Sequence, residues 1–223
     1  MLKYSKAGVL VAVMAFCGLL ASSAGAAEWH TNGTLAFSST NAGASRLVIH
    51  PSGTLVACSG SSGSGTLNGP TSTAFPWTNA ATVTPAFSGC TVSGAAGYSV
   101  LWGSGELRAS SYVGGTTLAT AGGGVTTGSV TNVDCRLSIG ATTCSTITGS
   151  VPAHYINPAT TTDSGTLTIT PAGQQLEVTK IGTGCAAVPN GTGTFGKPGA
   201  GSTVDDLTYP VPGPHAPNIF TTT

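Results

Sequence analysis

The chain has 223 residues, with seven basic and seven acidic side chains, so that only 6% of it is charged, against about 25% in an ordinary domain. So few cations exclude the basic stripe that nucleic-acid binding or polybasic membrane docking requires. Hydrophobic residues make up 40% of the chain and its mean hydropathy is +0.26, which excludes intrinsic disorder.

The first 26 residues have the pattern of a secretory signal peptide. Lys3 and Lys6 give a positive start, Ala7 to Ala21 is an almost unbroken apolar run, and Ser22 to Ala27 supplies small residues for cleavage. The apolar run is too short for a comfortable membrane span. We therefore predict a secreted protein, extracellular or at the cell surface, that has no integral membrane segment once the signal peptide is removed.

After the signal peptide the pattern is that of short β-strands. Apolar and hydroxyl side chains alternate in short runs between Gly, Pro, Ser and Asn clusters, and no helical stripe of apolar positions is present. We predict an all-β fold, an antiparallel β-sandwich of jelly-roll or immunoglobulin-like form, in a single domain from residue 27 to 209. The predicted strands are 35–37, 47–49, 55–57, 98–102, 106–112, 130–139, 146–148, 166–170, 176–181 and 207–211.

Glycine and proline mark the predicted irregular segments. Ser59–Gly65 and Gly114–Gly128 are rich in glycine, and we predict that both are loops within the one domain. The last segment, 210–223, contains four prolines, which cannot donate to a β-ladder. We predict that this segment is an extended tail that lies along a sheet edge or hangs free.

Two hairpins follow from the alternation. In the first, Thr166–Thr170 reverses through a Pro-Ala-Gly turn into Leu176–Lys180, with the aliphatic side chains of both strands on the buried face. In the second, the chain turns about Ile139–Gly140, because glycine accepts the positive φ of a tight turn.

Five cysteines follow the signal peptide, so one is left over from any pairing within the chain. Counting outward from the second hairpin turn places Cys135 opposite Cys144, within disulfide range, and we predict that bond. Cys58 ends one strand and Cys90 follows an apolar run, and we predict a second bond between them. Cys185 is then a buried free thiol or is bonded to another chain.

We find no motif for a cofactor or a metal. Gly191–Gly196 matches the dinucleotide-binding GxGxxG string, but prolines flank it and no helical pattern follows, so we interpret it as a loop. None of the histidines is followed by a His, Cys or carboxylate at the i+2 or i+4 spacing of a metal-ligand pair. The four are His30, His50, His154 and His215.

The sequence also predicts no catalytic site. It lacks the Gly-x-Ser-x-Gly elbow of a serine hydrolase. Asp205 and Asp206 are adjacent, so in a strand they point to opposite faces and do not form a matched acid and base. A hydrolase is nevertheless a third hypothesis for the function, and it predicts a cleft that joins a histidine to a carboxylate.

Two tryptophans are candidate ligand contacts. Trp77 follows a proline at a predicted surface corner, and together with Trp29 it could stack on a sugar ring, as aromatic faces do in carbohydrate-binding sandwiches. Trp102 ends an alternating strand and is predicted to lie in the core.

Phe75-Pro76-Trp77, followed by Ala86-Phe87-Ser88-Gly89-Cys90, resembles the alkane-oxidation protein activator family. The Ser-Gly-Thr-Leu strands that begin at Ser52 and Ser164 are similar to the same family. Its members are small secreted bacterial β proteins associated with the cell surface and with extracellular filaments. The resemblance implies an extracellular structural role and brings no catalytic residues with it.

Together these observations predict a secreted, non-enzymatic structural protein of the cell surface or extracellular matrix. The expected partners are copies of itself or other surface components. Filaments could form by strand addition, in which residues 28–38 or the 210–223 tail complete the sheet edge of the next subunit. The alternative is a secreted binding module for a glycan or an apolar ligand, with Trp29 and Trp77 exposed on one face.

Overall fold

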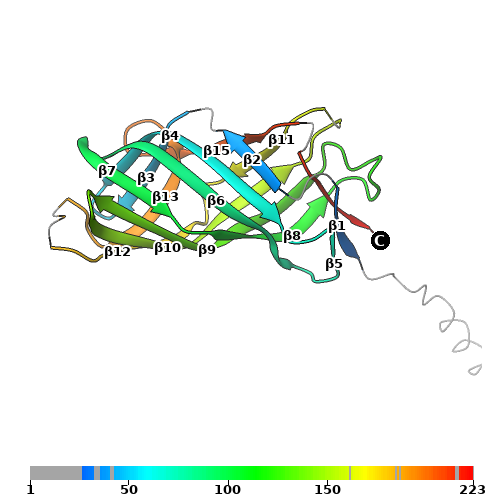
Figure 1. Ribbon diagram of the computed structural model, residues 1–223, viewed down its shortest axis with the longest axis horizontal. Coiled ribbons are helices and arrows are strands. Elements are labelled where there is room, and N and C mark those ends of the chain that lie inside the picture. Colours follow the sequence, from blue (N-terminus) through cyan, green and yellow to red (C-terminus); the bar gives the residue numbers. More distant parts are fainter. Residues whose placement is uncertain are drawn as a thin grey trace, which may run out of the picture.

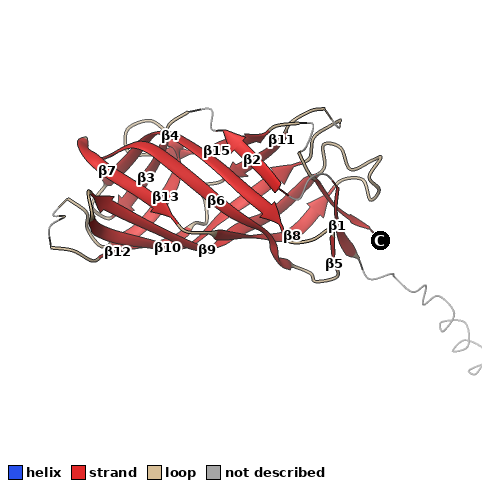
Figure 2. Cartoon of the chain, viewed as in Figure 1, coloured by secondary structure: helices blue, strands red, loops and turns tan. Residues whose placement is uncertain are grey.

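A computed structural model describes residues 27–32, 36–40, 43–160, 162–183, 185, 187–213 and 216–222. Within these residues the chain is all-β and its strand pairings are antiparallel, which confirms the predicted fold class (Figures 1 and 2). The predicted signal peptide lies outside the described residues. The strands are β1 (Glu28–Asn32), β2 (Ala36–Thr40), β3 (Ser45–His50), β4 (Thr54–Leu67), β5 (Thr71–Ser72), β6 (Trp77–Val92), β7 (Ala95–Trp102), β8 (Gly105–Val113), β9 (Val125–Ile139), β10 (Thr142–Ile156), β11 (Gly165–Ile169), β12 (Gln175–Lys180), β13 (Gly191–Pro198), β14 (Val204–Asp205), β15 (Leu207–Val211) and β16 (Asn218–Thr222).

The main sheet closes on itself. Neighbouring strands pair in the circuit β10-β12-β13-β3-β4-β6-β7-β9 and back to β10, which makes an eight-stranded barrel. The long strands β4, β6, β9 and β10 continue into a second half, where β11, β15, β2 and β8 replace the four short ones. There β2 and β15 are neighbours, and Ser39 Oγ donates a hydrogen bond to the carbonyl of Pro210 at 2.6 Å. Figure 1 shows the resulting elongated barrel.

The predicted sandwich is therefore corrected to a closed barrel, and the reason lies in the long strands. Strands of 14 to 16 residues replace the short ones that the alternation suggested. Their ladders contain register shifts, as between Gly149 and Val151 and between Ala109 and Ser111. Such bulges bend a strand and increase its twist, and a strongly coiled antiparallel sheet closes on itself instead of splitting into two layers.

The two predicted hairpins have different outcomes. The β9–β10 hairpin exists, with its turn at Gly140, whose φ is +55°. The first prediction was wrong, because β11 and β12 do not pair with each other. Instead Thr166–Ile169 lies along Ala153–Ile156 of β10, and Gln175–Lys180 continues along Ser145–Ser150 of the same strand. The chain therefore keeps its direction through the Pro-Ala-Gly segment, so that β11 and β12 lie one after the other along β10.

Both glycine-rich segments contribute strands. Ser59–Gly65 is part of β4, and Gly114–Gly128 is a loop only as far as Gly124, because β9 begins at Val125. Glycine is needed within β4 because the ring of Phe37, on β2, occupies the place where a Cβ of Gly65 would stand. Glycine content alone does not distinguish a loop from a strand, because glycine also occurs in strands where a neighbouring strand approaches closely.

A second, three-stranded sheet covers one end of the barrel. In it β1 lies between β16 and β5, so residues from both ends of the described chain pair with each other. Trp29, fully buried, and Ile219, 2% exposed, join the same hydrophobic core as the barrel strands. Part of the predicted 210–223 tail is therefore structured: Pro210 and Val211 end β15, and β16 is a strand of this end sheet.

Candidate functional site

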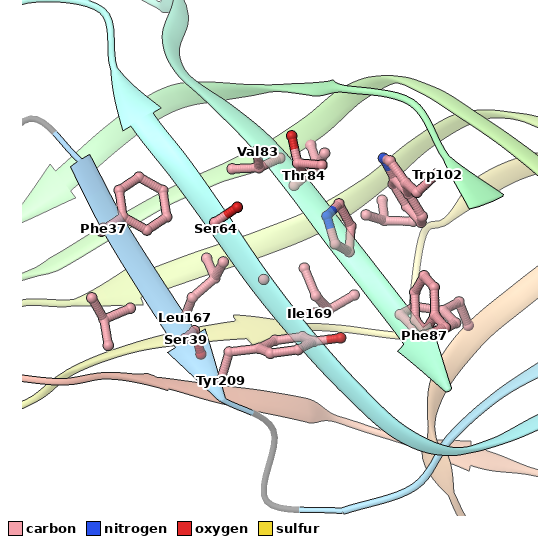
Figure 3. Close-up of a pocket in the computed structure, with 16 residues that line it drawn as sticks. Phe37, Ser39, Ser64, Val83, Thr84, Phe87, Trp102, Leu167, Ile169 and Tyr209 are labelled. Carbon is pink, nitrogen blue, oxygen red and sulfur yellow. The ribbon is translucent and has the colours of Figure 1, made fainter. Parts of the chain in front are cut away.

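The barrel interior contains three adjoining apolar cavities, which we call the central, the second and the third cavity. Their volumes are about 60, 40 and 20 Å³ respectively. Figure 3 shows the central cavity, with Phe37 on one side and Phe87 and Trp102 on the other. Protein interiors rarely hold voids larger than a water molecule. Leaving a void costs about 24 cal/mol per Å³, so the three cavities together cost about 3 kcal/mol of stability.

Aromatic side chains separate the cavities. Phe87, Trp102 and Phe195 border both the central and the second cavity. The ring centroids of Phe87 and Trp102 are 5.9 Å apart, and those of Phe87 and Phe195 are 5.7 Å apart with the rings edge to face. On the other side, Phe37 and Leu167 border both the central and the third cavity. The voids therefore form a row that runs along the barrel, divided by side chains and not by backbone.

Most polar groups of the interior have partners. Tyr209, at the central cavity, shares a hydrogen bond of 3.1 Å with Ser61, and burial raises the pKa of its phenol to about 12. Three residues at the second cavity each have a buried atom without a hydrogen-bond partner within the described chain: Ser45 Oγ, Arg46 Nε and Trp102 Nε1. Ser45 is 1% exposed. An unpaired buried donor is costly, so these three atoms would gain from a partner in the cavity.

The cysteine predictions are half right. Cys58 and Cys90 lie opposite each other on β4 and β6 and are bonded, as predicted. Cys135 is not bonded to Cys144 but is free, and its actual cross-strand partner is Ile147. The hairpin turn lies one residue later than predicted, and Cys144 occupies a register shift between Thr143 and Ser145.

Cys144 is bonded to Cys185 instead, the cysteine that the prediction had left over. The thiol of Cys135 faces the second cavity, and burial, followed by the charge of Asp134, raises its pKa far above the usual value. It is therefore a protonated, unreactive group at the cavity wall.

The two tryptophans predicted as ligand contacts do not form an exposed face. Trp29 is fully buried in the end sheet, with Phe75 stacked on it at 4.9 Å between ring centroids. Trp77 is 7% exposed and begins β6. Trp102, predicted as a core residue, packs against the core from β7 and is the tryptophan that borders the cavities. The alternation of side chains within β7 was enough to predict the position of Trp102, because Val100 and Trp102 lie on the same, inward face of the strand.

Histidines and carboxylates are scattered through the described residues. Within these residues one contact joins His30 Nε2 to Glu28 Oε2 at 3.5 Å on β1. The sequence pattern did not reveal this pair, because each histidine was compared only with the residues that follow it. Nε2 of His50 lies 3.3 Å from Oγ1 of Thr194. His215 lies outside the described residues. No group of three metal-ligating side chains is found in the part of the chain that the structure describes. The hydrolase hypothesis gains no support from this arrangement.

Large apolar side chains are exposed toward both ends of the barrel. Leu101 on β7 is 61% exposed, and Ile181, just after β12, is 60% exposed. In Figure 1 these strands lie at the end opposite β1 and β16. Toward the other end Val113, 74% exposed, pairs with Val125, which in turn pairs with Ile156. The second group is thus a row of three aliphatic side chains across β8, β9 and β10.

Side chains from β10 and from the residue after it hold the last strand in place. Asn157, 2% exposed, donates from Nδ2 to the carbonyls of Ala121 and Ile219 at 2.9 and 2.8 Å, and its Oδ1 accepts from the amide of Ile219 at 2.9 Å. The hydroxyl of Tyr155 donates to the carbonyl of Pro217 at 2.7 Å. These bonds satisfy backbone groups along the edge of β16 that faces away from β1.

No protein-family model, no curated protein and no solved structure matches this chain. The resemblance to the alkane-oxidation protein activator family therefore stays a prediction. Among the described residues, no helix has the length and apolar character needed to cross a membrane.

Proposed function

We propose that this is an exported, non-enzymatic structural protein of the cell surface or extracellular matrix that works by contact between copies of itself. The observation that carries the proposal is the exposure of large aliphatic side chains toward both ends of an elongated barrel. The Val113–Val125–Ile156 row lies toward one end, whereas Leu101 and Ile181 are exposed singly toward the other, with β9 and β10 between their strands. Exposed apolar groups gathered at defined places on a soluble protein mark interaction sites.

The geometry of two unlike ends favours head-to-tail assembly. A contact between different surfaces of identical subunits repeats indefinitely unless its rotation closes a ring, so it generates filaments. Charge opposes such a contact very little, because the mature chain carries five basic and seven acidic residues. Two disulfides suit a protein that folds and remains in an oxidising compartment, which fits export.

Side-chain contact is a better mechanism for this barrel than strand addition. The segments suggested as donors are used within the same chain: β1 is held between β16 and β5, and β2 lies against β4. Each strand of the eight-stranded circuit pairs on both sides, which leaves β2, β5 and β15 with one pairing each among the described strands, and Asn157 bonds to the backbone of Ile219 on the outer edge of β16. We therefore place the contacts at the exposed aliphatic side chains.

The test is the assembly state of residues 27–223, purified with both disulfides formed. We expect light scattering and negative-stain electron microscopy to show oligomers or filaments that grow with protein concentration. Val113→Thr keeps the shape of the side chain but not its apolar character, and it should raise the concentration needed for assembly about tenfold. Ser99→Thr, at an exposed position of β7, is the matched control and should change nothing. A monomer at millimolar concentration, or assembly unaffected by Val113→Thr, contradicts the proposal.

A further inference from the structure

We propose that the barrel interior binds one small, mainly aliphatic molecule that carries a single carbonyl group. Its chain would occupy the central cavity, and its oxygen would accept hydrogen bonds in the second cavity from Trp102 Nε1 and Ser45 Oγ. This inference is independent of self-assembly, because it concerns the inner face of the barrel and the assembly surfaces are on the outer face.

The walls determine the chemical class of the molecule. The central cavity is bordered by side chains such as Phe37, Val83 and Ile169, which offer dispersion contacts and no charge. Eight-stranded barrels have interiors just wide enough to be filled by side chains or to hold one small ligand. The central and second cavities have volumes of about 60 and 40 Å³, less than the roughly 150 Å³ of a cavity that accepts benzene, so the occupant has at most about six non-hydrogen atoms.

The unpaired donors determine its polar group. An indole N–H can only donate, so Trp102 Nε1 requires an acceptor, and Ser45 Oγ–H can donate to the same kind of atom. A carbonyl oxygen offers two lone pairs and brings no donor of its own that would remain unpaired. Both residues border the second cavity, and Trp102 also borders the central cavity where the aliphatic part would lie.

Arg46 adds a third donor at the second cavity. Its Nη1 donates to the carbonyls of Gly201 and Thr203 at 2.7 and 3.2 Å, in the turn after β13. Its Nε is buried without a hydrogen-bond partner within the described chain, and Arg46 borders the second cavity. An Nε–H group can only donate, so it requires the same kind of partner as Trp102 Nε1, an acceptor oxygen.

Gly63 provides a way to close the site. It lies on β4 at the wall of the central cavity, and a Cβ added there would meet nothing within 4 Å. Gly63→Val therefore fills the cavity without displacing a neighbour. Gly43 has equally open surroundings but is exposed and borders none of the three cavities. Gly43→Val is the matched control for adding the same side chain.

The experiment is a titration of the oxidised mature protein with 2-pentanone, n-pentane and pentanoate, followed by the indole N–H signals in ¹H–¹⁵N spectra. The chain has three tryptophans, and Trp29 and Trp77 border none of the cavities, so they serve as internal references. We expect 2-pentanone to shift the Trp102 signal downfield in a saturable way. Because two hydrogen bonds are gained, at about 1 kcal/mol each, 2-pentanone should bind about thirtyfold tighter than n-pentane.

Variants separate the two parts of the proposal. Gly63→Val should abolish the binding of both uncharged probes, whereas Gly43→Val should not change it. Trp102→Phe should reduce the preference for the ketone but leave n-pentane binding intact, and Ser45→Ala should also reduce that preference in a protein that keeps all its aromatic side chains. The proposal is overturned if neither probe binds saturably, if Gly63→Val binds like the wild type, or if neither donor variant affects the preference. Tighter binding of pentanoate than of 2-pentanone would mean that the acceptor is a carboxylate beside Arg46 and would overturn the single carbonyl.

Discussion

Asn157→Ala tests whether one buried amide holds the carboxyl-terminal strand on the barrel. The substitution leaves two backbone groups without a partner, the carbonyl and the amide of Ile219, because the carbonyl of Ala121 still accepts from the amide of Gly124 at 3.0 Å. Each buried group left unpaired costs about 1 kcal/mol or more, so the free energy of unfolding should fall by about 2 kcal/mol. Because β16 covers Trp29 through β1, its release should also expose that tryptophan.

Two measurements check this prediction. Urea unfolding gives the change in stability, and acrylamide quenching reports exposure of Trp29, which should rise in a variant that also carries Trp102→Phe. Asn190→Ala is the control, because Asn190 is exposed and its side chain accepts one hydrogen bond, from the amide of Lys180; its loss should cost less than about 1 kcal/mol. If Asn157→Ala costs no more than this control, the amide is not the anchor that its geometry indicates.

Three further predictions concern the barrel wall. Cys144→Ser opens a bond that spans 41 residues and should lower the free energy of unfolding by about 4 kcal/mol on loop entropy; guanidinium unfolding with and without reductant measures it, and an equal stability of variant and oxidised wild type would contradict it. Burial raises the folded-state pKa of Tyr209 to about 12, above the usual value of about 10. The stability that its neutral phenol contributes is therefore present below about pH 10 and is lost between about pH 10 and 12. Urea titrations across that range should show stability falling, less steeply in Tyr209→Phe, and identical slopes would refute the assignment. Gly65→Ala places a methyl group against the Phe37 ring and should lower the free energy of unfolding by about 1 to 3 kcal/mol. Thermal unfolding measures this loss, and an unchanged melting temperature would show that β2 can move away from β4 without cost.

The strands that could be predicted are those rich in branched aliphatic residues. Val130–Ile139 lies in β9, where apolar side chains at alternate positions are buried, and Leu47–Ile49 lies in β3, where all three consecutive side chains are buried. The sequence did not reveal most of β6 or any of β13, whose positions are largely Ala, Thr, Ser, Gly and Pro. Ala, Gly and Pro are depleted in strands, so among these residue types threonine alone favours a strand and neighbouring strands decide the conformation.

Closure of the barrel and the Cys144–Cys185 bond could not be predicted for a shared reason. Both depend on register, and register here depends on bulges that have no clear sequence signal. A turn one residue later than expected and one bulge at Cys144 together move the partner of Cys135 from Cys144 to Ile147 and leave Cys144 available for Cys185. Alternation predicts which face a side chain occupies, but a single extra residue changes what lies across from it.

The cavities follow from the way in which glycines and large side chains face one another inside the barrel. Gly65 lies under the ring of Phe37, and Gly193 lies against Leu47, so each of these glycines is covered by a side chain of a neighbouring strand. Gly63 is also in β4 and borders the central cavity, but nothing covers it. Part of the central cavity therefore exists because Gly63 has no side chain to fill it.

Gly63→Val should stabilise the protein if this account is correct. The three added carbons would be buried in the central cavity, which at about 0.8 kcal/mol per carbon gives a gain of about 2 kcal/mol in the free energy of unfolding. Urea unfolding of Gly63→Val beside Gly43→Val measures it, since the exposed control gains no burial. A loss of stability in Gly63→Val would mean that the space is not open and that the cavity cannot serve as a site. A gain would mean that the natural sequence forgoes stability at this position, as is common where a protein must keep room for a ligand.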